Sequence, residues 1–332
     1  MKIGVILAVL FGLVLATGVI AYFGVGGVLH ALATIGWRGF FVLCGYSVLP
    51  ICLLGLAWFL LAPNQPPSRY GLFVWARMVR DAASEHLPFS QFGGFVIGAR
   101  VAILHGICPT QAFATTVVDA TAELIAQIAF IGLGLGVLAL RLGGKSAHSA
   151  LLGSSLIGLV LCMVGAVAFI GLQRRGAGLV EKLARRFLPG AVPQAGAVSA
   201  ALNVLYQRPL RICLAVGVHF AAWVASGTGA WLALRLTGVH LGLSDVLAIE
   251  SLLGAVRSAA FAAPMAVGVQ EAGYALVGPL FGLAPDMALA LSLLKRARDL
   301  AIGLPTLLVW QGFEAKRLVS LAGATAKVEA AQ

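Results

Sequence analysis

Ionisable side chains stand at helical spacing inside apolar stretches of this sequence, where they are the groups most able to do chemistry. Asp119 and Glu123 are four residues apart, as are Lys295 and Asp299, and this spacing places each pair on one face of a helix. A charge inside a membrane is costly unless it is paired or hydrated. We expect Lys295 and Asp299 to form an ion pair, with Arg298 as a spare cation for a phosphate or carboxylate. The alternative is that these charges only fix helix packing.

Two groups of polar side chains flank breaks in the apolar pattern. The first break carries Pro88, Gly93 and Gly94, and the second carries Pro264 and Gly268. We take as further ligand-binding candidates Arg77, Arg80, Asp81, Glu85, Gln91 and Arg100 at the first break, and Arg257, Gln270 and Glu271 at the second. The alternatives are a solvated interfacial helix at the first break, a flexible turn at the glycines, and a helix cap at Glu271.

The two breaks belong to a repeated pattern. Pro88 is followed by Gly106 and Pro109, and the same spacing recurs 176 residues later from Pro264 through Gly282 and Pro285. In this register Glu123 is equivalent to Asp299. Broken hydrophobic segments at matching positions in two halves of a chain indicate the binding site of a transporter.

Composition defines the class of protein. Hydrophobic residues make up 60% of the 332 residues and charged residues 11%, and the mean hydropathy is +0.98. A soluble domain is about one quarter charged, so we expect a single transmembrane domain over residues 1–332. The net charge of +11 is concentrated in a basic segment at about 173–211. A basic segment beside membrane spans indicates a cytoplasmic loop rather than nucleic-acid binding.

The apolar runs predict an all-α, polytopic membrane protein, because long continuous runs exclude a barrel of short alternating strands. A short interfacial helix is expected at Val25–Thr34. Two helical hairpins that enter and leave the membrane on one side are expected from Tyr70–Glu85 with Phe95–His105, and from Val246–Ala262 with Gln270–Leu280. The expected membrane spans are Ile3–Phe23, Trp37–Leu61, Thr110–Leu140, Leu151–Leu172, Ile212–Thr237 and Met287–Trp310.

Charge bias gives these elements an orientation. With both termini and the basic segment in the cytoplasm, the first hairpin enters from the cytoplasm and the second from the other side. The two repeats, at about 70–140 and 246–312, are then inverted relative to each other, as in many secondary transporters. Each repeat is a proline-broken hairpin followed by a long span.

Other kinds of site have no support in the sequence. The histidines lack metal-binding spacing, the cysteines form no C-x-x-C pair, and there is no nucleotide-binding or hydrolase motif. We therefore expect neither a metal nor a cofactor, and no enzymatic activity.

Three blocks of residues resemble a known family. Arg80–Arg100 and Phe261–Tyr274 are similar to the two signatures of the flippase-like membrane family named for the transmembrane region of lysylphosphatidylglycerol synthase. Ser292–Asp299, with Gly303-Leu-Pro305 and Trp310-Gln311, resembles the hopanoid-biosynthesis-associated branch of that family (HpnL type). One departure is Met265-Ala266-Val267, where the family commonly has a glycine-rich turn.

The resemblance implies a lipid translocase of a bacterial inner membrane that handles a polar-headed lipid related to hopanoids. It does not imply aminoacyl transfer, which belongs to a separate soluble domain in bifunctional relatives. On this reading Arg257, Lys295 and Arg298 contact the headgroup, and Glu271, Asp119 or Glu123 supplies counter-charge or proton coupling. The alternatives are an accessory protein that binds enzymes of lipid synthesis, and an ion-coupled transporter of a small solute.

Overall fold

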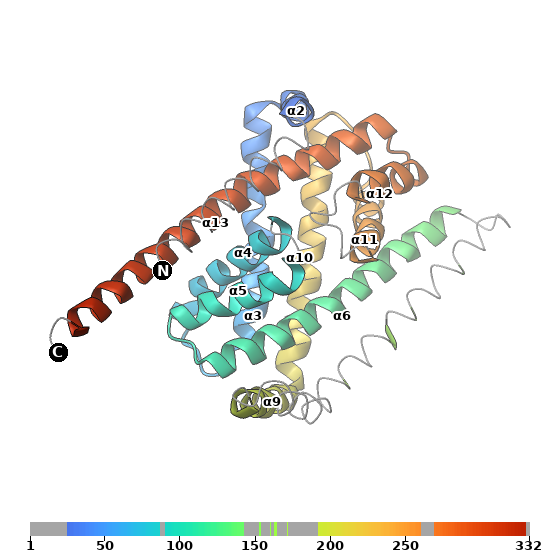
Figure 1. Cartoon of the computed structure of the whole chain (residues 1–332). Coiled ribbons are helices and arrows are strands. Elements are labelled where there is room, and N and C mark those ends of the chain that lie inside the picture. Colours follow the sequence, from blue (N-terminus) through green and yellow to red (C-terminus); the bar gives the residue numbers. More distant parts are fainter. Residues whose placement is uncertain are drawn as a thin grey trace.

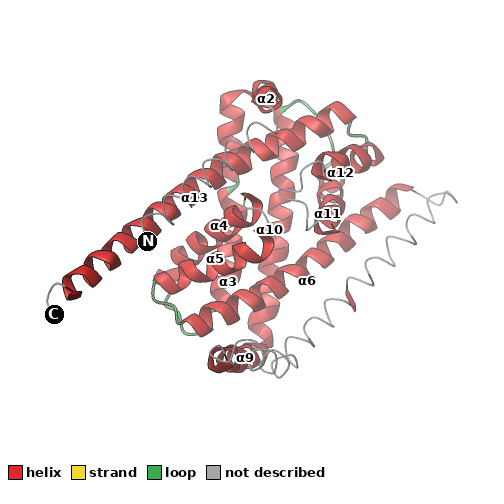
Figure 2. Cartoon of the chain, in the orientation of Figure 1, coloured by secondary structure: helices red, strands yellow, loops and turns green. Residues whose placement is uncertain are grey.

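The structure is a computed structural model, and it describes residues 25–86, 90–142, 192–259 and 269–329 with a few single positions between 153 and 171. The elements of this described part are helices, and it contains no strand (Figure 2). The prediction of an all-α protein is confirmed for these residues. Several predicted features lie outside them: the first span, nearly all of the span at 151–172, residues 173–191 of the basic segment, Pro88, Pro264 and Gly268.

Three of the predicted spans are present as long apolar helical stretches. They comprise Ile35–Leu61, Pro109–Arg141 and Pro209–Leu236. The last of these is helix α10, whose 28 residues give a length of about 42 Å. The hydrocarbon core of a bilayer is about 30 Å thick, so each stretch is long enough to cross it.

The first described span is built from two helices, α2 (Val25–Tyr46) and α3 (Val48–Leu61). Gly36 has φ 65° and ψ 166°, a non-helical conformation that kinks α2. Positive φ costs glycine little, because it has no Cβ. The kink lies at the start of the span Ile35–Leu61 and sets the preceding residues, predicted as a separate helix at Val25–Thr34, apart from it.

The two helices of the first predicted hairpin are α4 (Tyr70–His86) and α5 (Ser90–Leu104), which pack against each other. A Cβ on Gly94 would overlap the Ser84 hydroxyl, and one on Gly98 would lie 2.9 Å from the Arg80 Cβ. Glycines four residues apart allow this close approach of two helices. The prediction that Gly93 and Gly94 form a flexible break is wrong: both lie inside α5, and Gly94 is a packing contact.

The second predicted hairpin contains α11 (Leu243–Ala259) and α12 (Val269–Val277), with the 3₁₀ helix η4 (Gly278–Phe281) after α12. The last helix, α13 (Pro285–Glu329), is longer than the predicted span, which ended at Trp310. Pro305 lies inside α13 without ending it.

Two turns with the same hydrogen bonds precede α6 (Pro109–Leu142) and α13. Gly106 and Gly282 have φ 88° and 83°. After each glycine, the next amide donates to the carbonyl five residues earlier, at 3.1 and 3.0 Å. This is the Schellman end of a helix, in which glycine takes the left-handed position. Three residues after each glycine, Pro109 and Pro285 begin the next helix, where the missing proline N–H costs nothing.

The helices surround three larger buried apolar clusters and a small one of Ala82, Ala83 and Leu307. α3 and α10 lie side by side. In Figure 1 α6 and α13 lie along similar diagonals, but the chain runs through them in opposite directions. One cluster joins α4 and α5 to α3 around Trp58 and Phe73, and another joins α11, α12 and α13 to α10 around Tyr274 and Leu234. The third lies between α3, α6, α10 and α9 (Val192–Tyr206). The first hairpin therefore packs on α3 and the second on α10, while α13 runs mainly along α4 and α2.

Candidate functional site

Two arginines of α4 face two carboxylates of α6. Arg77 donates to Asp119 at 3.1 Å and to Glu123 at 2.6 Å. Arg80 donates to the same two carboxylates, at 2.5 and 2.8 Å. The guanidinium groups are 3% exposed and Asp119 is fully buried. Because the arginines are three apart on one helix and the acids four apart on the other, both pairs face each other along their helices.

Three further side chains complete this cluster. His219 of α10 places Nε2 2.9 Å from a carboxylate oxygen of Asp119, and both side chains are fully buried. Asp81 accepts from Arg77 at 2.8 Å, since residues four apart on a helix are neighbours. The ring of Phe95 on α5 stacks against the Arg80 guanidinium at 4.2 Å. We call the six ionisable residues the α4–α6 cluster: Arg77, Arg80, Asp81, Asp119, Glu123 and His219.

The charges of the α4–α6 cluster indicate what it can do. Two guanidinium groups face three carboxylates, so the cluster has a place for one more positive charge. His219 contacts Asp119 through Nε2, while its Nδ1 is buried without a partner among the described residues. Both arginines of the cluster are already paired with carboxylates.

A second buried cluster joins α11, α12 and α13. Lys295 donates to Glu250 at 2.5 Å and to the Tyr274 hydroxyl at 2.9 Å, and Tyr274 is hydrogen-bonded to Glu250. The prediction that Lys295 pairs with Asp299 is wrong, because Asp299 accepts from Arg298 at 2.7 Å instead. The prediction that Arg298 is a spare cation fails for the same reason. The first error arose because Glu250, the partner of Lys295 on α11, could not be recognised from spacing within one helix.

One ion pair connects the two hairpins. Arg257 of α11 donates to both carboxylate oxygens of Glu85 on α4, at 2.8 and 3.0 Å. The arginine side chain is 29% exposed and the glutamate 43% exposed. Both members of this pair are partly exposed, whereas the paired cations of the two buried clusters are 3% and 8% exposed.

The residues after the second break lie next to that ion pair. Gln270 donates to the Ser292 hydroxyl at 2.9 Å, and Glu271 accepts from Arg296 at 2.6 Å. Gln270 and Arg296 line a cavity of about 10 Å³ together with Glu85, His86, Asp299 and Leu300. This volume is at the lower limit for one water molecule, so the site as described is closed to a lipid headgroup.

Not every predicted residue belongs to this central region. Arg100 of α5 pairs with Glu314 of α13, and the arginine side chain is half exposed. Gln91 lies in α5, but its side chain is outside the described residues. A Cβ on Gly93 would meet no atom within 4 Å, so nothing near it indicates a ligand.

Sequence reasoning missed several partners of the predicted residues. His219 and Glu250 each lie in an otherwise apolar part of a helix, which was the available signal for a buried polar contact. Arg296 and Glu314 carried no such signal, because other charged residues surround them in the sequence. Within the described ranges no group of three histidine, cysteine or acidic side chains is placed to hold a metal ion.

Comparison with known proteins tests the family assignment. The model of the lysylphosphatidylglycerol synthase TM region matches residues 5–305 of the 332-residue chain. The chain belongs to this family. Searches among curated proteins and among solved structures each found no significant match.

Membership of the lysylphosphatidylglycerol synthase TM family supports a membrane protein with a lipid-related function. The matched residues include both buried clusters and the Glu85–Arg257 pair, whereas Glu314 lies beyond them. The charged groups at the centre of the molecule thus belong to the family region.

Proposed function

We propose that this protein moves a polar-headed lipid across a bacterial inner membrane, without covalent chemistry on the lipid. The observation that carries the proposal is the ion pair between Glu85 and Arg257, which joins the two hairpins and in which both side chains are partly exposed. An anionic headgroup that takes the place of Glu85 beside Arg257 would loosen the contact between the hairpins. Its acyl chains would remain among the apolar helices.

We infer further that the two halves are inverted repeats. The two Schellman turns at Gly106 and Gly282 support this inference, because equivalent amides and carbonyls bond in both. The opposite directions of α6 and α13 in Figure 1 are consistent with it. In such a fold, motion of one hairpin relative to the other would expose the Glu85–Arg257 pair to one membrane face and then to the other.

The α4–α6 cluster fits a coupling role in this scheme. Its arginines are already paired with Asp119 and Glu123, so they are poor binders of a headgroup. The third carboxylate leaves an excess negative charge that a coupling cation would balance. We propose that the headgroup contacts Arg257, while the cluster takes up the coupling ion or remains a fixed support.

The topology and the lipid class are part of the same proposal. Both termini are placed in the cytoplasm, following the basic residues of the segment at 173–211 and those after Trp310. The resemblance of Ser292–Asp299 to the hopanoid-associated branch makes a polar-headed hopanoid the first lipid to assay, with phosphatidylglycerol as the second.

The test is transbilayer movement in liposomes that contain the purified protein. A fluorescent lipid is added to both leaflets, and a membrane-impermeant quencher reports how fast the inner pool reaches the outer leaflet. We expect faster exchange than in empty liposomes, and a loss of roughly tenfold for Arg257→Gln, since a charge-assisted hydrogen bond to a headgroup contributes about 1.5–3 kcal/mol.

The matched control is Arg235→Gln, because Arg235 is exposed at the end of α10 and contacts Trp231 rather than an acid. Its exchange rate should equal that of the unmodified protein. Exchange no faster than in empty liposomes, for both the hopanoid and phosphatidylglycerol, would contradict translocation and favour an accessory role.

A further inference from the structure

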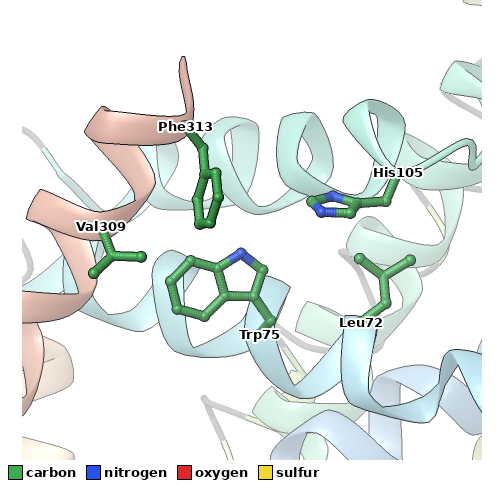
Figure 3. Close-up of a pocket in the computed structure, with 5 residues that line it drawn as sticks. All are labelled: Leu72, Trp75, His105, Val309 and Phe313. Atoms are coloured by element: carbon green, nitrogen blue, oxygen red, sulfur yellow. The ribbon is translucent and has the colours of Figure 1, made fainter. Parts of the chain in front are cut away.

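An apolar groove lies on the outer side of the first hairpin, apart from the charged centre. It has a volume of about 430 Å³ and lies between α4, α5 and α13, where it is lined by Leu72, Trp75, His105, Val309 and Phe313 (Figure 3). Phe313 is 63% exposed and Val309 is 49% exposed. The described residues therefore leave a large part of these apolar walls uncovered.

Polar atoms are present at one side of this groove. Figure 3 shows the indole nitrogen of Trp75 facing the opening between Phe313 and His105. The Nδ1 of His105 lies 2.8 Å from the Val101 carbonyl, so Nδ1 carries a proton and donates it there. The Nε2 atom is then left free for a polar contact with a ligand.

A positive charge lies just beyond His105. Arg69 lies three residues before Leu72, about one helical turn, directly before α4. One of its terminal nitrogens lies 3.8 Å from the position of a Cβ on Gly106, the residue after His105. Its other terminal nitrogen donates to Gln65 at 3.0 Å, which leaves further N–H groups for an anion.

We infer that this groove binds one acyl chain of a phospholipid, with the phosphate at Arg69. The order along the groove matches that of the lipid: cation, then indole N–H and imidazole nitrogen, then apolar walls. A phosphate would accept from Arg69, and an ester carbonyl would accept from Trp75. Aromatic side chains with one polar atom favour the boundary between headgroups and hydrocarbon. This site is independent of the proposed translocation, because it shares no residue with the Glu85–Arg257 pair.

Photolabelling of the intact protein in lipid nanodiscs tests the inference. The probe is phosphatidylglycerol with a diazirine in the middle of one acyl chain, and labelled peptides are identified by mass spectrometry. We expect labelling to concentrate on the peptides that contain Trp75 and Phe313. Val309→Trp fills the groove and should reduce this labelling about tenfold, as expected when a ligand must displace a packed side chain.

Two comparisons make the result decisive. Leu308→Trp adds the same side chain at a neighbouring position that is 65% exposed and outside the groove, and should leave labelling unchanged. Arg69→Gln should reduce labelling by phosphatidylglycerol about fivefold, the effect of one cation near a lipid phosphate. It should not affect labelling by diacylglycerol with the same diazirine chain.

Two outcomes would overturn the inference. Labelling spread evenly over the exposed helices and insensitive to Val309→Trp would mean only general contact with the bilayer. Cross-links between two copies of the chain at Phe313, in place of lipid labelling, would mean that the groove is a protein interface. Neither outcome bears on lipid exchange, so failure of this site and failure of translocation are separable.

Discussion

Asp119→Asn should strongly destabilise the protein, because Asp119 is the acceptor shared by three buried groups. It accepts from Arg77 at 3.1 Å and from Arg80 at 2.5 Å, and it contacts His219 at 2.9 Å. The substitution keeps the volume and removes the charge. Removing one partner of a buried ion pair costs about 3–5 kcal/mol, mainly because the remaining charge stays buried without compensation. Glu123 retains both arginines, so we expect the lower part of that range.

The assay is unfolding by sodium dodecyl sulfate from mild-detergent micelles, followed by circular dichroism, which gives the free energy of unfolding. The matched control is Asp286→Asn, the same chemical change at an exposed position in the first turn of α13. This variant loses only a helix-dipole interaction, so its free energy of unfolding should fall by less than about 1 kcal/mol. A double-mutant cycle with Arg80→Met should give a coupling energy of about 1–3 kcal/mol between Asp119 and Arg80.

The reasoning would be refuted if the free energy of unfolding of Asp119→Asn differed from that of the unmodified protein by less than about 1 kcal/mol, as expected for the control. Additive effects of Asp119→Asn and Arg80→Met would also refute it. In either case the contact between α4 and α6 would not be a buried, energetically coupled ion pair.

Two further predictions use the same unfolding assay. Gly303→Ala should destabilise the protein by about 1–3 kcal/mol, because the new Cβ would overlap the buried ring of His86. The control is Gly312→Ala, which has open space around the new Cβ and should be neutral or stabilising. Equal effects of the two alanines would contradict the packing of α13 on α4. Lys295→Met should lower the free energy of unfolding by about 3–5 kcal/mol, because it leaves the buried Glu250 without its cation. Adding Glu250→Gln should restore most of that loss, and no recovery would argue against the pair.

The sequence predicted helices and turns well where the signal is local. The boundaries of α6 and α10 agree with the apolar runs to within about three residues, the usual uncertainty of such boundaries. The equal spacing from Gly106 to Pro109 and from Gly282 to Pro285 corresponds to two turns with the same hydrogen bonds. The pair between Arg77 and Asp81 was also predictable, because residues four apart on a helix are neighbours wherever that helix lies.

Glycine near a break was the least reliable local signal. Gly93 and Gly94 follow the break at Pro88 and were expected to interrupt the helix, yet α5 runs through both. Gly94 lies against α4 so closely that a Cβ would overlap Ser84. Glycine allows both a turn and a close helix contact, and only the neighbouring helix decides between them.

The amino-acid sequence by itself determined that this is an all-α membrane protein and which residues carry charge inside it. Apolar runs and helical spacing are properties of one segment, so they need no knowledge of its neighbours. The tertiary structure decided which charges meet: Lys295 with Glu250 rather than Asp299, Asp119 with His219, and Glu85 with Arg257. Each of these contacts joins two helices, and the choice depends on how the helices rotate and cross, which packing of the whole molecule sets.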